Sequence, residues 1–338
     1  LQSNTLILAG LADSNFGGVV SGSGKILKSG SGVLTLSGSS SFSGGVELQS
    51  GGLLLAGSSN GTAAGAPLIA GPLGVGPLIL TGGPGAPFLQ SAPNVVLRND
   101  LLLGGSLDYR SPYTLTLNGA GTLGAGGYTS INVQSPQGTL IMGGVLSQGA
   151  YQAGLRKEGA GILALNNNNL FEGGILLNGG TLRLGGSTGS TAAPLPAFGL
   201  SSASVVRVSS GLLQIFNDGL ASNGTISFAD TKVVADSGAA ALSLQVGPNG
   251  GSFTGNTIRL GSLEMSAGQT LNLTNSGSYS LRIDALLTGT QNSTAPVLVN
   301  VGTGMSVVFG SVGKIRPVNV GAGTLLLPDW IEIQSQPT

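Results

Sequence analysis

Residues 28–57, KSGSGVLTLSGSSSFSGGVELQSGGLLLAG, decide the fold of this chain, because the same pattern occurs a second time. The second copy, residues 157–186, reads KEGAGILALNNNNLFEGGILLNGGTLRLGG and aligns with the first at a constant offset of 129 residues, without a gap. Each copy alternates apolar and polar residues in short runs that are separated by glycine-rich turns, which is typical of short β-strands. A unit of this kind cannot bury its apolar face alone, so the pair predicts a protein built from stacked repeats.

The two copies share an order of residue types. Each begins with lysine and Gly-x-Gly, continues with two leucines in alternation, carries an aromatic residue before Gly-Gly, and ends in a glycine-bounded leucine strand. This order resembles the autotransporter-associated β-strand repeat of bacterial passenger regions. The paired positions are Lys28/Lys157, Gly30/Gly159, Gly32/Gly161, Leu34/Leu163, Leu36/Leu165, Phe42/Phe171, Gly44/Gly173, Gly45/Gly174, Leu48/Leu177, Gly51/Gly180, Leu53/Leu182, Leu55/Leu184 and Gly57/Gly186.

The resemblance implies a fold and a secretion route. It implies an all-β chain folded as a right-handed parallel β-helix, and export to the bacterial surface, but no catalytic activity. Both copies depart from the family pattern where a Tyr-Thr-Gly-Gly-Thr run is expected: they read FSGGV at 42–46 and FEGGI at 171–175, which keeps the aromatic residue and the turn glycines. A β-sandwich is the alternative fold, since it also has short strands and glycine-rich turns.

The whole chain is expected to form one body. Because the core of stacked repeats grows along an axis, we predict a single elongated β-solenoid over residues 1–338. Residues 58–93 contain glycine and proline every few positions and predict turns and an excursion between rungs, since proline cannot donate to a β-ladder. Residues 187–197 predict a longer rung loop, with a domain boundary as the alternative. Short alternating segments over 94–141 and 204–329 predict further strands.

Composition narrows the class of protein. The 61 glycines and the 41% of hydrophobic residues are typical of strands separated by glycine-containing turns rather than of a disordered chain. The 13 basic and 13 acidic residues lie scattered, without the basic stripe of a nucleic-acid binder. Only 8% of the residues are charged, which gives the surface little protection against association. This favours a protein that is part of an assembly or lies at a cell surface. The chain lacks cysteine, which excludes disulfides, and lacks an apolar run of about 18 residues, which excludes a spanning helix.

The sequence contains little catalytic chemistry. Without histidine and cysteine, Ser-His-Asp and Cys-His mechanisms are excluded and zinc is not expected. Lys25 and Lys314 each follow glycine but lack the first glycine and the Ser or Thr of a phosphate-binding loop. Paired carboxylates of a glycosidase are the remaining option, with Glu158 and Glu172 in one repeat and Asp230 and Asp236 around one strand. The other acids are Asp13, Glu47, Asp100, Asp108, Asp218, Glu264, Asp284, Asp329 and Glu332.

Two further features receive structural interpretations. The run Asn166, Asn167, Asn168 and Asn169 is expected to make one polar turn. The paired Phe42 and Phe171 are expected inside the core rather than on a sugar-stacking face. We therefore assign no catalytic, cofactor-binding or metal-binding residue, and we expect no cofactor.

These observations favour a non-enzymatic structural or adhesion protein, a stalk like that of an autotransporter passenger. The expected location is extracellular, at the bacterial outer-membrane surface or secreted. The alternatives are a self-assembling filament or sheath subunit and a β-helix polysaccharide hydrolase or lyase. The expected partners are further copies of the chain, in fibres or arrays, or a surface glycan or protein ligand.

Overall fold

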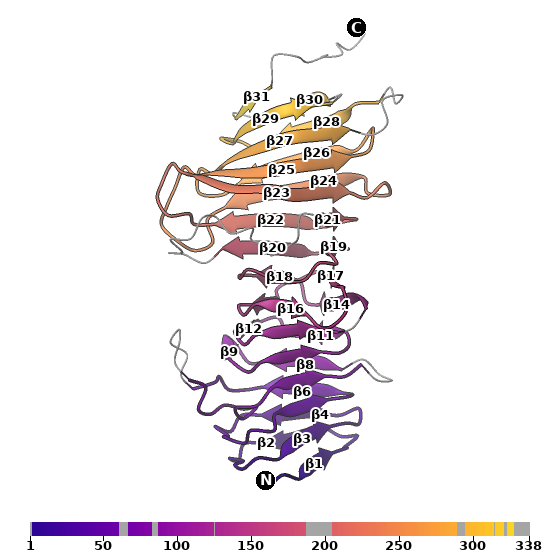
Figure 1. Cartoon of the computed structure of the whole chain (residues 1–338), viewed down its shortest axis with the longest axis vertical. Helices are drawn as coiled ribbons and strands as arrows, with labels where there is room; N and C mark the ends of the chain where they lie inside the picture. Colours follow the sequence, from indigo (N-terminus) through magenta and orange to yellow (C-terminus); the bar gives the residue numbers. More distant parts are fainter. Residues whose placement is uncertain are drawn as a thin grey trace. The chain divides into compact units, whose positions relative to one another are not determined.

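The chain folds as parallel β-structure (Figure 1). The computed structural model describes residues 2–60, 67–82, 87–124, 126–186, 205–288, 295–313, 315–320 and 323–327. Across these residues the regular elements are 31 strands, none of them is helical, and every described pair of strands is parallel. The predicted parallel β-helix is thereby confirmed, and the antiparallel β-sandwich is excluded.

The chain divides into two compact units. Unit 1 contains Leu1–Leu165 and Asn169–Gly173, and unit 2 contains Asn166–Asn168 and Gly174–Thr338. Each unit is a stack of rungs with its own core. Whether the two form the single elongated body expected from the repeats stays a prediction.

Unit 1 has three parallel sheets, which Figure 1 shows in indigo to magenta. The first sheet contains β1 (Thr5–Leu8), β3 (Lys25–Lys28), β5 (Val46–Leu48), β7 (Leu78–Leu80), β10 (Leu101–Leu103), β13 (Gly121–Leu123) and β16 (Leu146–Gln148). The second sheet contains β2 (Ser14–Phe16), β4 (Val33–Leu36), β6 (Gly52–Leu55), β8 (Phe88–Ser91), β11 (Leu107–Tyr109), β14 (Gly127–Val133) and β17 (Ala153–Glu158). The third sheet contains β9 (Val95–Leu97), β12 (Thr114–Leu117), β15 (Thr139–Met142) and β18 (Ile162–Leu165).

The rung of unit 1 has a short repeat length. Thr5 pairs with Lys25 and Ile26 pairs with Val46, so the first rungs begin 20 residues apart, whereas Val46 pairs with Leu78 across a longer connection. Side chains alternate between the core and the outer surface along each strand, as the period of two requires. In β4, Leu34 and Leu36 are buried while Val33 and Thr35 are partly exposed.

Two strands lie where the sequence predicted turns and an excursion. Within residues 58–93, β7 pairs with β5 and β8 pairs with β6, and Leu78, Leu80 and Leu89 are fully buried. The carbonyl of Pro77 accepts a hydrogen bond from the N–H of Val46 at 2.9 Å. Because this proline stands directly before β7, its missing N–H costs no ladder bond. Residues 61–66 and 83–86 lie outside the described part.

Unit 2 has two parallel sheets with longer strands. The β21 sheet contains β19 (Ile175–Leu177), β21 (Val205–Val208), β23 (Thr225–Ala235), β25 (Thr257–Met265), β27 (Ser280–Thr288), β29 (Ser306–Val312) and β31 (Thr324–Leu326). The β22 sheet contains β20 (Thr181–Gly186), β22 (Leu212–Asn217), β24 (Ala241–Gly247), β26 (Thr270–Asn275), β28 (Val297–Val301) and β30 (Ile315–Asn319). Leucine, isoleucine and valine fill the space between the sheets. The expected loop at 187–197 lies outside the described residues.

The two sequence copies form strands at matching positions, although the strands of the second copy lie one sheet further round the rung. Strands β3, β4, β5 and β6 of the first copy correspond, at the offset of 129, to β17, β18, β19 and β20. Phe42 and Phe171 are both fully buried, which confirms the core interpretation, and Leu165 faces the core as well.

Candidate functional site

The lysine that opens each repeat lies inside the protein. Lys28 is buried, and its Nζ donates to the carbonyls of Ser29 at 3.0 Å and Gly30 at 2.9 Å. A third bond, of 3.3 Å, reaches the carbonyl of Ser50 on the next rung. Lys157, which is 0% exposed, donates in the same way to the carbonyls of Glu158 at 2.6 Å and Gly159 at 2.8 Å.

This contact explains the Lys-x-Gly order of the repeat. Both glycines have a left-handed backbone, with φ of 84° at Gly30 and 76° at Gly159, so the turn bends sharply and points its carbonyls inward. Buried carbonyls need donors, and an ammonium group supplies three. Burial lowers the pKa of Lys28, against the opposing charge of Asp13, and lowers the pKa of Lys157 to about 8, against that of Glu158. The lysines therefore hold the corners of the rungs.

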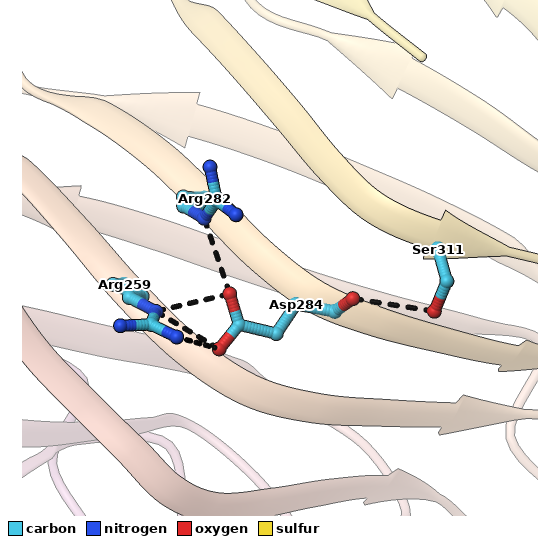
Figure 2. A network of polar contacts seen from close by, with 4 residues as sticks. All are labelled: Arg259, Arg282, Asp284 and Ser311. Carbon is cyan, nitrogen blue, oxygen red and sulfur yellow. Dashed lines mark hydrogen bonds and ion pairs between the residues drawn. The ribbon is translucent and has the colours of Figure 1, made fainter. Parts of the chain in front are cut away.

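On unit 2, charged residues gather on the outer face of the β21 sheet. Arg259 and Arg282 are direct neighbours on the parallel strands β25 and β27. Asp284 lies between them: its carboxylate accepts from Nε of Arg259 at 3.0 and 2.9 Å and from Nε of Arg282 at 3.1 Å. Figure 2 shows this bridge, and Ser311 donating to the main-chain oxygen of Asp284 at 3.2 Å. The hydrogen bond from Arg259, with a smaller effect of Arg282, lowers the pKa of Asp284.

Two further ion pairs cross the same face. Lys232 contacts Glu264 at 2.5 Å and Arg207 contacts Asp236 at 3.7 Å. These pairs are partly exposed, and each joins a basic residue of one rung to an acidic residue of the next. The face carries alternating charge and forms no cluster of one sign.

On unit 1, the outer face of the second sheet carries a polar network around Asp108. The carboxylate of Asp108 accepts from Arg110 at 3.0 Å, Asn132 at 3.1 Å and Gln134 at 2.9 Å. The guanidinium of Arg110 also lies 4.0 Å from the centre of the Phe88 ring. The network joins β8, β11 and β14, and it orders the guanidinium of Arg110 and the amides of Asn132 and Gln134 on the surface.

A polar corner in unit 2 contains a buried acid. Asp218 accepts from the main-chain N–H groups of Asn249 and Gly251, each at 2.7 Å, and is almost fully buried. The buried amide of Asn256 donates to the carbonyl of Asp218 at 3.0 Å and to the hydroxyl of Tyr279 at 3.1 Å. These bonds give the acid a structural role in the turn.

The structure does not place the suggested pairs of acids in a shared contact. Glu158 accepts from Ser130 at 2.8 Å, whereas Glu172 contacts Gln148 and Gln152 through its main chain. The side chain of Asp230 lies outside the described part, as do Lys314, Asp329 and Glu332. Of the remaining acids, Asp13 and Asp100 accept main-chain N–H groups, and Glu47, Asp108, Glu158, Asp236, Glu264 and Asp284 form ion pairs.

Two other sequence features have structural positions. Lys25, weighed as a phosphate ligand, lies in β3 and pairs with Glu47 at 2.6 Å. In the asparagine run, Oδ1 of Asn169 accepts the N–H of Leu146 at 2.9 Å, just as Oγ of the equivalent Ser40 accepts the N–H of Val20 at 3.0 Å. Both side chains thus bond the main chain of another rung, and the single polar turn expected for the asparagine run stays a prediction. Among the described residues, no group of three His, Cys, Asp or Glu side chains is arranged to hold a metal ion.

Comparison with known families gives a name to the lysine-bearing repeat. The sequence model of one family matches residues 26–55 and 155–184, which contain both lysine corners. The chain carries two passenger-associated-transport-repeats. The predicted autotransporter passenger repeat is thereby confirmed for these two stretches. Comparison with curated proteins and with solved structures finds no match.

Membrane insertion by a helix finds no support in the described residues, where no helix has the length and hydropathy to cross a bilayer. The two repeats indicate an autotransporter passenger-associated domain, and their family implies exposure at the surface or outside the cell.

Sequence reasoning missed the role of the repeat lysines. Ile26 and Lys28 are two residues apart in one strand, so the period of two places both on the inner face. That signal was present in the sequence. The bridge at Asp284 had no such signal, because it depends on which residues the rungs place side by side.

Proposed function

We propose that this chain is a non-enzymatic segment of a surface-exposed passenger and serves as a stalk. The observation that carries the proposal is the place of the two passenger-associated-transport-repeats in the fold, since their strands are ordinary rungs of the ladders and their lysines hold rung corners. The repeats thus build the scaffold itself. The described polar groups mostly satisfy one another, which suits a structural body better than a reaction site.

Mechanical cohesion follows from the ladders. In a parallel stack every rung is bonded to the rungs beside it, and the apolar columns of leucine, isoleucine and valine are continuous within each unit. Pulling such a stack apart requires many main-chain bonds to break together. A stalk needs this property and no bound cofactor.

Two experiments test the proposal. Antibodies against the folded chain should label intact cells of the source organism, and proteinase K should remove the label without permeabilisation. The purified chain should release no reducing ends from a panel of neutral and acidic polysaccharides above the buffer control. Labelling only after permeabilisation would contradict the surface location, and release of reducing ends would support the alternative of a β-helix hydrolase or lyase.

A further inference from the structure

An aromatic ring laid over a glycine of the neighbouring strand, with an arginine beside the ring, recurs on the outer faces. Such a ring covers main chain that a glycine leaves bare, as in the aromatic rescue of strand glycines. The arginine lies 4.0, 5.7 or 5.0 Å from the ring centre. The three sets are Phe88 with Gly52 and Arg110, Tyr128 with Gly154 and Arg156, and Phe216 with Gly247 and Arg183.

Of the two sets in unit 1, the one at Tyr128 has the less covered aromatic ring. Phe88 has Arg110 stacked close to its ring, and Asp108 holds that arginine in place. Tyr128 lies against Gly154, where a β-carbon would come within 2.7 Å of the ring, but Arg156 is 5.7 Å from its centre. Tyr128 is 42% exposed. One of its faces is therefore available to a ligand.

Arg156 beside this ring has hydrogen-bonding capacity to spare. Its ion pair with Glu158 is loose, at 4.0 Å. Its Nε is buried and makes no hydrogen bond within the described part of the chain, so a ligand would meet the other guanidinium nitrogens of this 40% exposed side chain. Glu158 is the register partner of Asn132 and accepts from Ser130 at 2.8 Å, which leaves its second oxygen to the weak pair. A donor fork and an acceptor thus stand side by side next to an open ring.

Fixed polar groups extend the same surface. Along β14, Tyr128, Ser130 and Asn132 point outward at every second position, and Gln134 follows. Asn132 and Gln134 are held by Asp108, so their amides are ordered before any ligand arrives. The charges of this face are two arginines and two carboxylates, which cancel.

We propose that the outer face of β11, β14 and β17 binds a neutral oligosaccharide, with Tyr128 as its stacking ring and the Arg156–Glu158 pair bound to its hydroxyl groups. A sugar ring presents an apolar C–H face that suits an aromatic ring. Its hydroxyls both donate and accept, so they need a donor and an acceptor together. The balanced charge argues against nucleic acid or a strongly acidic polymer, which require a positive surface. This inference does not depend on the passenger assignment.

The test uses the whole chain and defined probes: cellohexaose, mannohexaose, maltohexaose and β-1,4-galactohexaose, each titrated by calorimetry. At least one should bind with a Kd of about 0.1 to 1 mM, a range suited to an open surface. The affinity should be the same in 50 mM and 500 mM NaCl, because the ligand is neutral. Alginate and heparin serve as acidic probes.

Matched variants separate the site from the fold. Tyr128→Ala should weaken binding at least tenfold, Tyr128→Phe should retain it, and Arg156→Gln should weaken it at unchanged thermal stability. Phe88→Ala and Tyr151→Ala should bind like the parent, since Phe88 is covered and Tyr151 is an exposed tyrosine outside this face. If Tyr128→Ala does not fold, the test rests on Arg156→Gln and Glu158→Gln, each of which should weaken binding. Lack of binding to all four neutral probes, unchanged binding in the variants, or binding only to salt-sensitive alginate or heparin would overturn the proposal.

Discussion

Lys28 and Lys157 stand 129 residues apart, and each places its ammonium group against the carbonyl oxygen of the glycine two residues further along, at 2.9 and 2.8 Å. Both side chains are buried at a corner of unit 1. A charged group inside an apolar core is costly unless its donors are satisfied. The turn carbonyls satisfy them, and the lysines in turn satisfy the carbonyls. Each buried ammonium group and the turn carbonyls that it contacts therefore depend on one another.

Replacing the buried lysine should therefore destabilise the protein. Lys28→Met fills a similar volume but removes the donor to the carbonyls of Ser29, Gly30 and Ser50, which costs about 2 kcal/mol in the free energy of unfolding. Lys25→Met in the same strand removes only the partly exposed pair with Glu47 and should lower the free energy of unfolding by less than about 1 kcal/mol. Urea unfolding of both variants checks this, and equal losses would contradict the proposed role.

Stability should rise with pH between about 7.5 and 9.5. Burial lowers the pKa of Lys157 to about 8, below its ordinary 10.5, so in this range the unfolded chain binds more protons than the folded one. Folding then becomes easier as protons are removed, by about 2 kcal/mol over the range. The measurement is the difference between the parent and Lys157→Met at each pH. The range stops below pH 10 because burial raises the pKa of Tyr109, whose ionisation on unfolding acts in the opposite direction. A difference that does not vary with pH would refute the assignment.

Asp284→Asn should destabilise unit 2 mildly, and more strongly in low salt. Arg259 and Arg282 are register neighbours, so without the carboxylate two like charges face each other. Because these groups are partly exposed, we expect a fall of about 2 °C in the melting temperature, shrinking as NaCl is raised. Adding Arg282→Gln should restore part of the loss. Since hydrogen bonding by Arg259 lowers the pKa of Asp284, its contribution is present at neutral pH and is lost as the solution is acidified through that lowered pKa.

Adjacent residues of β10 provide a test of the inward and outward faces. Leu103 is 1% exposed and Leu102 is 41% exposed. Leu103→Asp places an unpaired charge in the core and should cost more than about 4 kcal/mol or prevent folding. Leu102→Asp should cost less than about 1 kcal/mol. Circular dichroism during thermal unfolding distinguishes them, and similar melting temperatures would disprove the assignment of faces.

Much of the fold follows from local pattern. The alternation in residues 33–36 and 162–165 predicts strands with leucine inside, and β4 and β18 match these bounds. Phe42 and Phe171 could be assigned to the core because they recur at equivalent turns. The period of two even marks Lys28 as inward, although its partners are visible only once the turn carbonyls are placed.

The remainder depends on loop length. Strands β7 and β8 escaped prediction because proline and glycine around them mask short apolar runs, and only their pairing with β5 and β6 reveals them. The Asp284 bridge requires β25 and β27 to meet with Arg259 opposite Arg282, a register that the intervening turns set. Likewise Tyr128 and Arg156 become neighbours only when β14 and β17 stack. The sequence of a single strand does not show which residues of another strand will lie beside it.

The twenty-residue register between β1, β3 and β5 bears on how such a chain can evolve. Loss or duplication of one complete rung brings the same columns back into alignment, so length can change in steps without redesign of the core. A step of a single residue instead turns every inward side chain of a strand outward. Genes for chains of this type are therefore expected to grow and shrink by whole rungs.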